Sequence, residues 1–262
     1  MASTKIKKHP TPPPSSPADW SYPYPPLQSG RLIKRYKRFM ADIELDSGET
    51  ITAHCPNTGP MTGVYIQGNR VMVSKSDNPK RKLAYTWELI EVDDNGPTWV
   101  GVNTSLPNRV VKSVLEAQLI PELGQYDTIR PEKPYGKNKK SRIDFFLSSG
   151  DEGQSADTKP IYVEVKNTTW VDKTLALFPD TVTTRGQKHL QELMDVVPEA
   201  RAVMLYFINR GDCHQFSPGD AADPTYGELL REAIAKGVEV LPCRFDISPT
   251  EIRYLGLAEL IL

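Results

Sequence analysis

The hydrophobic pattern of this chain changes its period near residues 93–97, and that change constrains the fold more than any other feature of the sequence. Between residues 30 and 97, apolar and polar residues alternate in short runs separated by turns, as in "FMADIEL" (39–45). Such alternation places every second side chain on one face of a strand. Four or five strands within about 70 residues predict a five-stranded OB-like β-barrel over residues 28–97.

Helical and strand patterns alternate after residue 97. "VVKSVLEAQL" (110–119) repeats apolar residues at helical spacing, and "RGQKHLQELMDVV" (185–197) has the pattern of a second amphipathic helix. "RAVMLYFIN" (201–209) is a continuous apolar run typical of a buried strand. This alternation predicts an α/β domain over residues 98–262.

The first 27 residues are rich in proline, as in "HPTPPPSSP" and "SYPYPPLQ". A segment of this composition cannot bury enough apolar surface to fold alone, so residues 1–27 are predicted to be a disordered tail. Lys5, Lys7 and Lys8 precede the first acidic residue, Asp19, which leaves a short organelle-targeting peptide open as an alternative.

The overall composition excludes several classes of protein. The 32 basic and 33 acidic residues give a formal net charge of -1, so any signal for nucleic acid must be local. No apolar run approaches the roughly 20 residues that a membrane helix needs, so no membrane partner is expected. Three widely spaced cysteines argue against a disulfide framework and favour a reducing, cytoplasmic location.

Two strands with charged residues on one face flank a polar loop. In "RIDFFL" (142–147) and "IYVEVK" (161–166), apolar side chains occupy one strand face and leave Asp144, Glu164 and Lys166 on the other. If the two strands are neighbours, the three charged side chains converge on one side of the sheet.

These residues have the chemistry of a metal-dependent phosphodiesterase. The carboxylates of Asp144 and Glu164, with the backbone carbonyl of Val165, form an oxygen-rich set that suits Mg²⁺ or Mn²⁺. Lys166 would orient or deprotonate an attacking water, and Glu116 on the preceding helix is an accessory candidate. The alternative is a solvated ion pair worth under about 1 kcal/mol, because this spacing is common in unrelated proteins.

Local basic segments supply the signal for nucleic acid. "KRYKR" (34–38) interleaves four cations with an aromatic ring, which suits phosphate contacts and base stacking, although it also fits a charged strand edge. "TTRGQKHLQEL" opens a helix whose N-terminus favours anions; within it, His189 is expected to be structural or to face the substrate. The residues predicted to bind nucleic acid are Lys34, Arg35, Tyr36, Lys37, Arg38, Lys80, Arg81, Lys82, Lys139, Lys140, Arg142, Arg185 and Lys188.

Longer motifs resemble the sugar fermentation stimulation protein A family. "RLIKRYKRFMADIEL", "AHCPNTGPMTG", "NPKRKLAYTWEL", "YVEVKN" and "FPDTVTTRGQKHLQEL" follow one another as in that family. The resemblance implies an OB-like N-terminal domain and a restriction-endonuclease-like domain of the PD-(D/E)xK type with a central mixed sheet, hence a mixed α+β chain. It also implies DNA binding linked to the regulation of sugar (maltose) metabolism genes.

The resemblance assigns the motif residue by residue. Asp144 and Glu164 match the two acidic positions of the PD-(D/E)xK motif, and Lys166 matches its lysine. Ile143 stands where the strict motif has proline, so the match is relaxed.

Three hypotheses of function remain open from the sequence. The first is a DNA-binding protein with a Mg²⁺-dependent nuclease site, and the second is a non-catalytic DNA-binding regulator that uses a nuclease-like fold as a platform. The third is a hydrolase that acts on RNA or nucleotides. An exposed barrel edge would also allow oligomers, but the sequence does not fix the oligomeric state.

Overall fold

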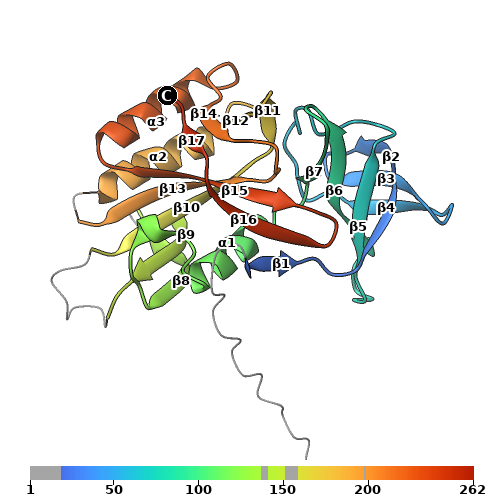
Figure 1. Ribbon diagram of the computed structural model, residues 1–262, viewed down its shortest axis with the longest axis horizontal. Coiled ribbons are helices and arrows are strands. Elements are labelled where there is room, and N and C mark those ends of the chain that lie inside the picture. Colours follow the sequence, from blue (N-terminus) through green and yellow to red (C-terminus); the bar gives the residue numbers. More distant parts are fainter. Residues whose placement is uncertain (1–18, 137–140, 151–158, 198) are drawn as a thin grey trace, which may run out of the picture.

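The computed structural model describes residues 19–136, 141–150, 159–197 and 199–262. It consists of a β-barrel domain followed by a larger α/β domain (Figure 1). The disordered tail and the targeting peptide predicted for the first residues lie, up to residue 18, outside this described part.

The barrel has the expected five strands and a sixth that extends it. Strands β4, β3, β2, β5 and β6 pair in this order, and a parallel pairing between β4 and β6 closes the ring. The sixth strand, β7, pairs antiparallel with β6 at its outer edge. Alternating apolar residues fill the interior, including the fully buried Trp87. The strands are β2 (Leu27–Tyr36), β3 (Met40–Leu45), β4 (Thr50–His54), β5 (Arg70–Lys75), β6 (Tyr85–Asp93) and β7 (Pro97–Gly101).

A seven-stranded mixed sheet forms the centre of the second domain. Its order is β1-β16-β15-β13-β10-β9-β8, in which β10, β13 and β15 run parallel and the other pairings are antiparallel. The strands are β1 (Ser21–Pro23), β8 (Thr128–Tyr135), β9 (Ser141–Ser148), β10 (Ile161–Thr168), β13 (Arg201–Ile208), β15 (Glu239–Ile247) and β16 (Glu251–Leu257).

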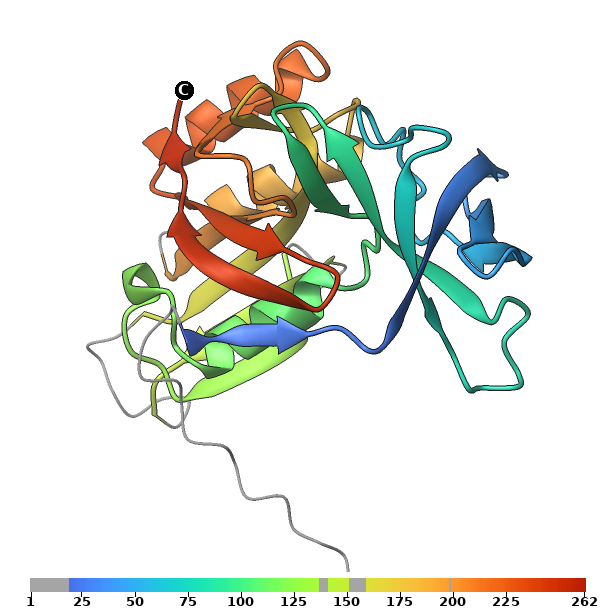
Figure 2. The ribbon, with the colours of Figure 1, turned by 45° about the vertical axis from the view of Figure 1, so that its right-hand side comes forward.

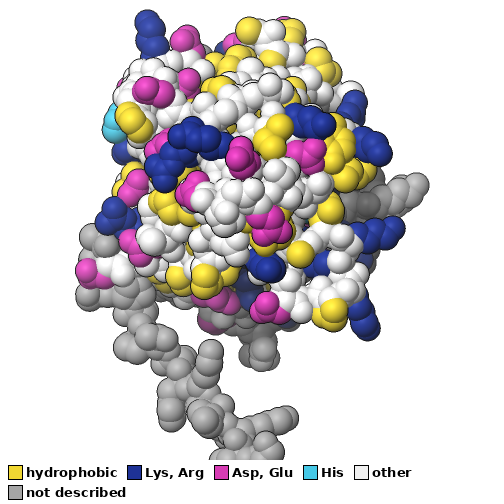
Figure 3. Space-filling model, turned by 90° about the vertical axis from the view of Figure 1, so that its right-hand side faces the viewer, with side chains coloured by type: hydrophobic (Ala, Val, Ile, Leu, Met, Phe, Trp, Pro, Cys, Tyr) yellow, Lys and Arg dark blue, Asp and Glu magenta, His cyan; other side chains and the backbone are white. Residues whose placement is uncertain are grey.

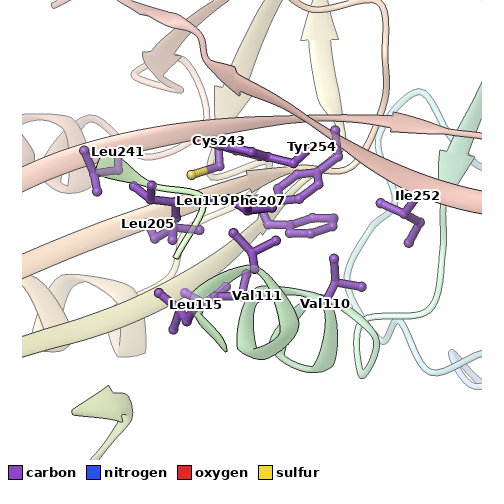
Figure 4. Close-up of a cluster of buried hydrophobic side chains, with 14 of the residues drawn as sticks. Val110, Val111, Leu115, Leu119, Leu205, Phe207, Leu241, Cys243, Ile252 and Tyr254 are labelled. Carbon is purple, nitrogen blue, oxygen red and sulfur yellow. The ribbon is translucent and has the colours of Figure 1, made fainter. Parts of the chain in front are cut away.

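Helices cover both faces of this sheet. Helix α1 (Pro107–Glu116) packs its apolar stripe on one face, where Val111 and Leu115 lie against residues of β13 and β15 (Figure 4). Helices α2 (Thr184–Val196) and α3 (Pro224–Ala235) cover the other face. In the described part of the chain, no helix is long and apolar enough to cross a membrane.

A small second sheet and a short helix complete the domain. The sheet has the order β11-β12-β14-β17 and contains β11 (Trp170–Asp172), β12 (Leu175–Phe178), β14 (Gln215–Pro218) and β17 (Glu259–Leu260). A 3₁₀ helix spans Pro121–Leu123.

The segment around β1 differs from the sequence-based expectation. Residues 19–27 were predicted to belong to a disordered tail, but β1 pairs antiparallel with β16 beside α1 (Figure 2). Trp20 and Tyr24 are only 6% and 9% exposed and belong to the same apolar cluster as α1. Two large aromatic side chains bury enough surface to fix the segment, and an edge strand tolerates its prolines.

Polar contacts join the two domains. Arg210, two residues after the end of β13, is 1% exposed and forms ion pairs with Asp94 of the barrel and with Asp212, each at 2.7 Å. Asn209 forms two hydrogen bonds with Gly101 across the same junction: its backbone carbonyl accepts from the Gly101 N–H at 3.0 Å, and its Nδ2 donates to the Gly101 carbonyl at 3.2 Å. Buried, charge-assisted contacts of this kind fix the orientation of the barrel relative to the sheet.

Candidate active site

The candidate site lies where β9 and β10 separate. Their pairing covers Ile161–Val163 of β10, whereas β10 continues to pair with β13 as far as Thr168. Beyond Val163, the carboxylate of Asp144 replaces a backbone acceptor, because its Oδ2 accepts a 2.8 Å hydrogen bond from the backbone N–H of Val165. A carboxylate side chain is thus inserted at the point where a neighbouring strand would otherwise continue.

Glu164 lies at the centre of a buried polar cluster. Its side chain is 4% exposed, its Oε1 accepts a 2.7 Å hydrogen bond from Lys166 Nζ, and the same oxygen contacts Nδ1 of His189. Burial alone would raise the pKa of Glu164, but the hydrogen bond from His189 and the charge of Lys166 outweigh it and hold the pKa below its ordinary value. Glu164 is therefore an ionised carboxylate inside the protein.

Both ring nitrogens of His189 have polar neighbours. Its Nε2 lies 3.4 Å from Nε of Arg185, a group that only donates hydrogen bonds. Its Nδ1 contacts Oε1 of Glu164 and also lies 3.0 Å from Nζ of Lys166. His189 orients the carboxylate from helix α2.

Asp144 has a different electrostatic environment. Its Oδ1 accepts a 2.7 Å hydrogen bond from Nδ2 of Asn108, on the first turn of α1. Burial and the nearby charge of Glu164 raise the pKa of Asp144 to about 6, despite the hydrogen bonds that it accepts. A pair of neighbouring carboxyl groups, one with a raised pKa, is typical of a functional site, and a cation between them would stabilise the ionised form of both.

The oxygen atoms available here suit a small divalent cation. Oε2 of Glu164 is buried and has no hydrogen-bond partner among the described residues. The N–H and C=O of a strand residue point to the same edge, so the Val165 carbonyl faces the edge occupied by Asp144. No group of three His, Cys, Asp or Glu side chains in the described ranges has the arrangement of a metal site. Mg²⁺ usually takes only one or two protein carboxylates and keeps several waters, so the present set fits it.

A cavity of about 370 Å³ opens at the carboxylates and has a basic rim. Arg142, Arg185 and Lys188 line it together with Asp144 and Glu164, and the three basic residues are exposed. Two of these basic side chains already have partners within the protein. Arg142 Nη1 donates to the carbonyl of Glu132. Lys188 Nζ donates to Ser141 and forms an ion pair with Glu192, so both side chains are held in place at the rim.

Glu116 does not join the site. Its side chain is 56% exposed and pairs with Lys112 on the same helix at 3.3 Å. Asn108, eight positions earlier on α1, reaches Asp144 instead, and eight residues of helix span about 12 Å. The structure thus places Glu116, predicted as an accessory residue, outside the lining of the cavity, whereas the contact of Asn108 could not be predicted from its position near the start of a helix.

The basic hairpin 34–38 is partly engaged within the barrel. Arg35 donates through its guanidinium to the carbonyls of Arg38, Asn57 and Gly59 at 2.9–3.0 Å. Lys34 lies 3.5 Å from Asp42, and Tyr36 also donates to that carboxylate. Lys37 and Arg38 have positive φ angles in the hairpin turn and are exposed.

The barrel face seen in Figure 3 carries basic side chains interspersed with acidic and apolar ones. Of the second predicted barrel group, Lys80 and Lys82 are exposed, whereas Arg81 is half-buried and donates to Thr86 at 2.8 Å. Lys139 and Lys140 lie outside the described residues. The basic groups nearest to the carboxylates are thus Arg142, Arg185 and Lys188, rather than those of the hairpin.

Comparison with family models covers both domains. A model described as the SfsA N-terminal OB domain matches residues 33–102, and one described as the sugar fermentation stimulation protein RE domain matches residues 105–251. The boundary between the two matches falls just after β7, a few residues beyond the boundary predicted from the sequence.

Individual relatives match over nearly the whole chain. A sugar fermentation stimulation protein homolog from Synechococcus elongatus is 70% identical over 241 residues, which cover 92% of this chain and 98% of the relative. The homolog from Cyanothece sp. is 66% identical over 245 residues, covering 94% and 100%. Among solved structures, SfsA of Pyrococcus furiosus in complex with Ca²⁺ is similar with a TM-score of 0.79 and 25% identity, covering 92% of this chain and 98% of that one.

Proposed function

The chain belongs to the sugar fermentation stimulation protein family, and from the geometry of its polar site we propose that it binds nucleic acid, DNA in the first place, and hydrolyses phosphodiester bonds with a divalent cation. Asp144, Glu164 and the carbonyl of Val165 would hold Mg²⁺ or Mn²⁺. The observation that carries the proposal is the buried, unpartnered Oε2 of Glu164 beside Asp144, in a cavity rimmed by basic side chains.

The solved structure from Pyrococcus furiosus supports the proposed cation. That protein is described in complex with Ca²⁺, an ion that, like Mg²⁺, takes oxygen ligands. Oε2 of Glu164 is buried without a hydrogen-bond partner among the described residues, which is costly, and a cation bound to it would remove this cost.

The residues of the chain have separate tasks in this proposal. A bound divalent cation would polarise a phosphate and lower the pKa of a water. Lys166 and His189 keep Glu164 ionised and in place, because each contacts its Oε1. Asn108 and the Val165 N–H orient Asp144. Arg142, Arg185 and Lys188 offer positive charge to the phosphate backbone at the mouth of the cavity.

The test compares cleavage by the full chain with Mg²⁺ and with EDTA, on single-stranded and duplex DNA and RNA. Wild type is expected to cut at least one substrate only with Mg²⁺, and Glu164→Gln should reduce the rate about a hundred-fold or more. Glu116→Gln is the matched control, since this carboxylate is exposed and outside the site. If wild type binds nucleic acid but cuts none of these substrates, the chain is a non-catalytic regulator and the proposed hydrolysis is wrong.

A further inference from the structure

A separate cavity, of about 400 Å³, lies where three parts of the chain meet. Tyr22 and Tyr24 come from the segment around β1, and Arg109 comes from the first turn of α1. The barrel contributes His54, Arg81 and Glu88. The nuclease proposal gives no role to this cavity, although domain junctions are common places for ligands.

Its most unusual member is Glu88. This residue is 6% exposed, and its carboxylate accepts hydrogen bonds from Ser74 Oγ at 2.6 Å and from Asn103 Nδ2 at 2.8 Å. Both donors are neutral, and in the described part of the chain Glu88 forms no ion pair. A carboxylate has about four acceptor positions, so it can still accept from a ligand. A buried carboxyl group that faces a cavity and has only these two hydrogen-bond donors can accept from a ligand that offers N–H groups.

Aromatic and proline side chains form a wall of the cavity. Tyr24 is 9% exposed, and its hydroxyl has no hydrogen-bond partner among the described residues. Tyr22 and the prolines Pro23 and Pro25 lie beside it. A planar ring with polar edges could stack on such a wall while it satisfies the hydroxyl.

Basic groups gather at the same cavity. Arg109 is exposed; its backbone N–H donates to the Leu106 carbonyl, but its guanidinium forms no hydrogen bond or ion pair within the described part of the chain. Helix α1 begins at Pro107 without a side-chain cap, so its positive end is also available here. Arg81 donates one N–H to Thr86 and keeps others. These groups suit a phosphate.

We propose that this cavity holds one unpaired nucleotide of the nucleic-acid strand, with its phosphate at Arg109 and the start of α1 and its base between the tyrosines and Glu88. The inference rests on the proposed function, because Arg109 directly follows Asn108, which contacts Asp144. Both cavities thus lie at the first turn of α1, where Arg109 lines this one and Asn108 contacts Asp144. An unpaired base requires single-stranded or locally opened nucleic acid.

The base that fits Glu88 best is guanine. Its N1–H and N2 amino group are adjacent donors and match the two oxygens of a carboxylate, whereas thymine offers a single N–H at that edge. We therefore expect a preference for guanine, with cytosine and adenine intermediate and thymine last.

The experiment is calorimetric titration of the full chain with guanosine 5′-monophosphate in EDTA, with thymidine 5′-monophosphate, guanosine and inorganic phosphate as comparison ligands. The guanine nucleotide should bind at least about ten-fold more tightly than each of the others. Arg109→Ala should weaken its binding about ten-fold or more, as expected for a charged hydrogen bond. Glu88→Gln should remove the preference over thymidine monophosphate, and Lys112→Ala, on the exposed side of the same helix, should bind as wild type does.

Two results would overturn the inference. One is binding of guanosine monophosphate no tighter than that of inorganic phosphate, and the other is binding unaffected by both Arg109→Ala and Glu88→Gln. These titrations contain no Mg²⁺ and measure no cleavage, so they separate the two proposals. Cleavage without nucleotide binding would reject the cavity alone, and nucleotide binding without cleavage would reject the hydrolysis alone.

Discussion

The two halves of β10 share one strand and one residue pattern, yet their surroundings differ. Ile161–Val163 pairs with β9 on one edge and with β13 on the other. In the half that begins at Glu164, β13 still pairs, but the β9 edge is occupied by the Asp144 carboxylate. The site is therefore created where sheet pairing ends, because only there can side chains and ligands replace backbone partners.

The largest expected effect is a loss of cleavage at Lys166 that does not occur at Tyr162, on the same face of β10. Lys166→Met removes the ammonium group that contacts Glu164, and we expect cleavage to fall about a hundred- to a thousand-fold. Tyr162→Phe, four residues earlier in the paired half, should leave cleavage within about two-fold, since Tyr162 packs between the rings of Phe146 and Tyr135. Rates under single-turnover conditions measure both, and equal losses would erase the distinction between the halves.

The paired half is expected to govern stability instead. Val163 is fully buried against the α1 side of the sheet, so Val163→Ala should lower the free energy of unfolding by about 2–3 kcal/mol. Val182→Ala is the control, because Val182 is 62% exposed and should change stability by less than about 0.5 kcal/mol. Urea unfolding measures both variants. A large loss of activity per folded molecule in Val163→Ala would show that the two halves are not independent.

Beside the half of β10 that begins at Glu164, the ionised carboxylate of Asp144 should lower the stability of the folded protein, and Asp144→Asn should remove this effect. The pKa of Asp144 is about 6 in the folded protein and 3.8 in its ordinary state, so the folded protein loses stability as pH rises from about 4 through 6. Asp144→Asn cannot ionise and keeps a similar shape. In EDTA at pH 7.5 it should be more stable than wild type by about 2 kcal/mol.

The pH dependence makes this prediction specific. The advantage of Asp144→Asn in thermal unfolding should shrink as pH falls from 7 to 4, because wild-type Asp144 is then increasingly protonated. An advantage that stays constant with pH would mean that repulsion and burial of the charge are not its cause. Saturating Mg²⁺ should reverse the order at pH 7.5, because wild type alone keeps both carboxylates.

The strand pattern predicted the central residues of the site but not their environment. Alternation in "IYVEVK" correctly placed Glu164 and Lys166 on one face. It could not show that α2 covers this face, which leaves Glu164 only 3% exposed and brings His189 onto it. The contact of Asn108 with Asp144 depends on how α1 docks, and residues 36 positions apart give no local signal.

Composition alone was a poor guide to the structure of the segment around β1 and of the basic residues 34–38. Proline content suggested disorder for the segment around β1, but the burial of Trp20 and Tyr24 outweighs it. The cations of "KRYKR" suggested one surface for nucleic acid. The guanidinium of Arg35, however, donates hydrogen bonds to the carbonyls of Asn57 and Gly59 within the barrel domain. Charge counts along a sequence cannot distinguish a cation that is free from one whose donors are already used.

The smallest expected effect tests the residue that the sequence did not reveal. Asn108→Ala removes the 2.7 Å hydrogen bond to Asp144 Oδ1 but leaves the one from the Val165 N–H. Asp144 would keep its place with less constraint, so Mn²⁺, titrated calorimetrically, should bind about ten-fold more weakly. Lys112→Ala, one turn further along the exposed side of α1, should bind Mn²⁺ as wild type does. Unchanged Mn²⁺ binding in Asn108→Ala would mean that the backbone of β10 alone orients Asp144, and the end of strand pairing would then account for the whole site without help from α1.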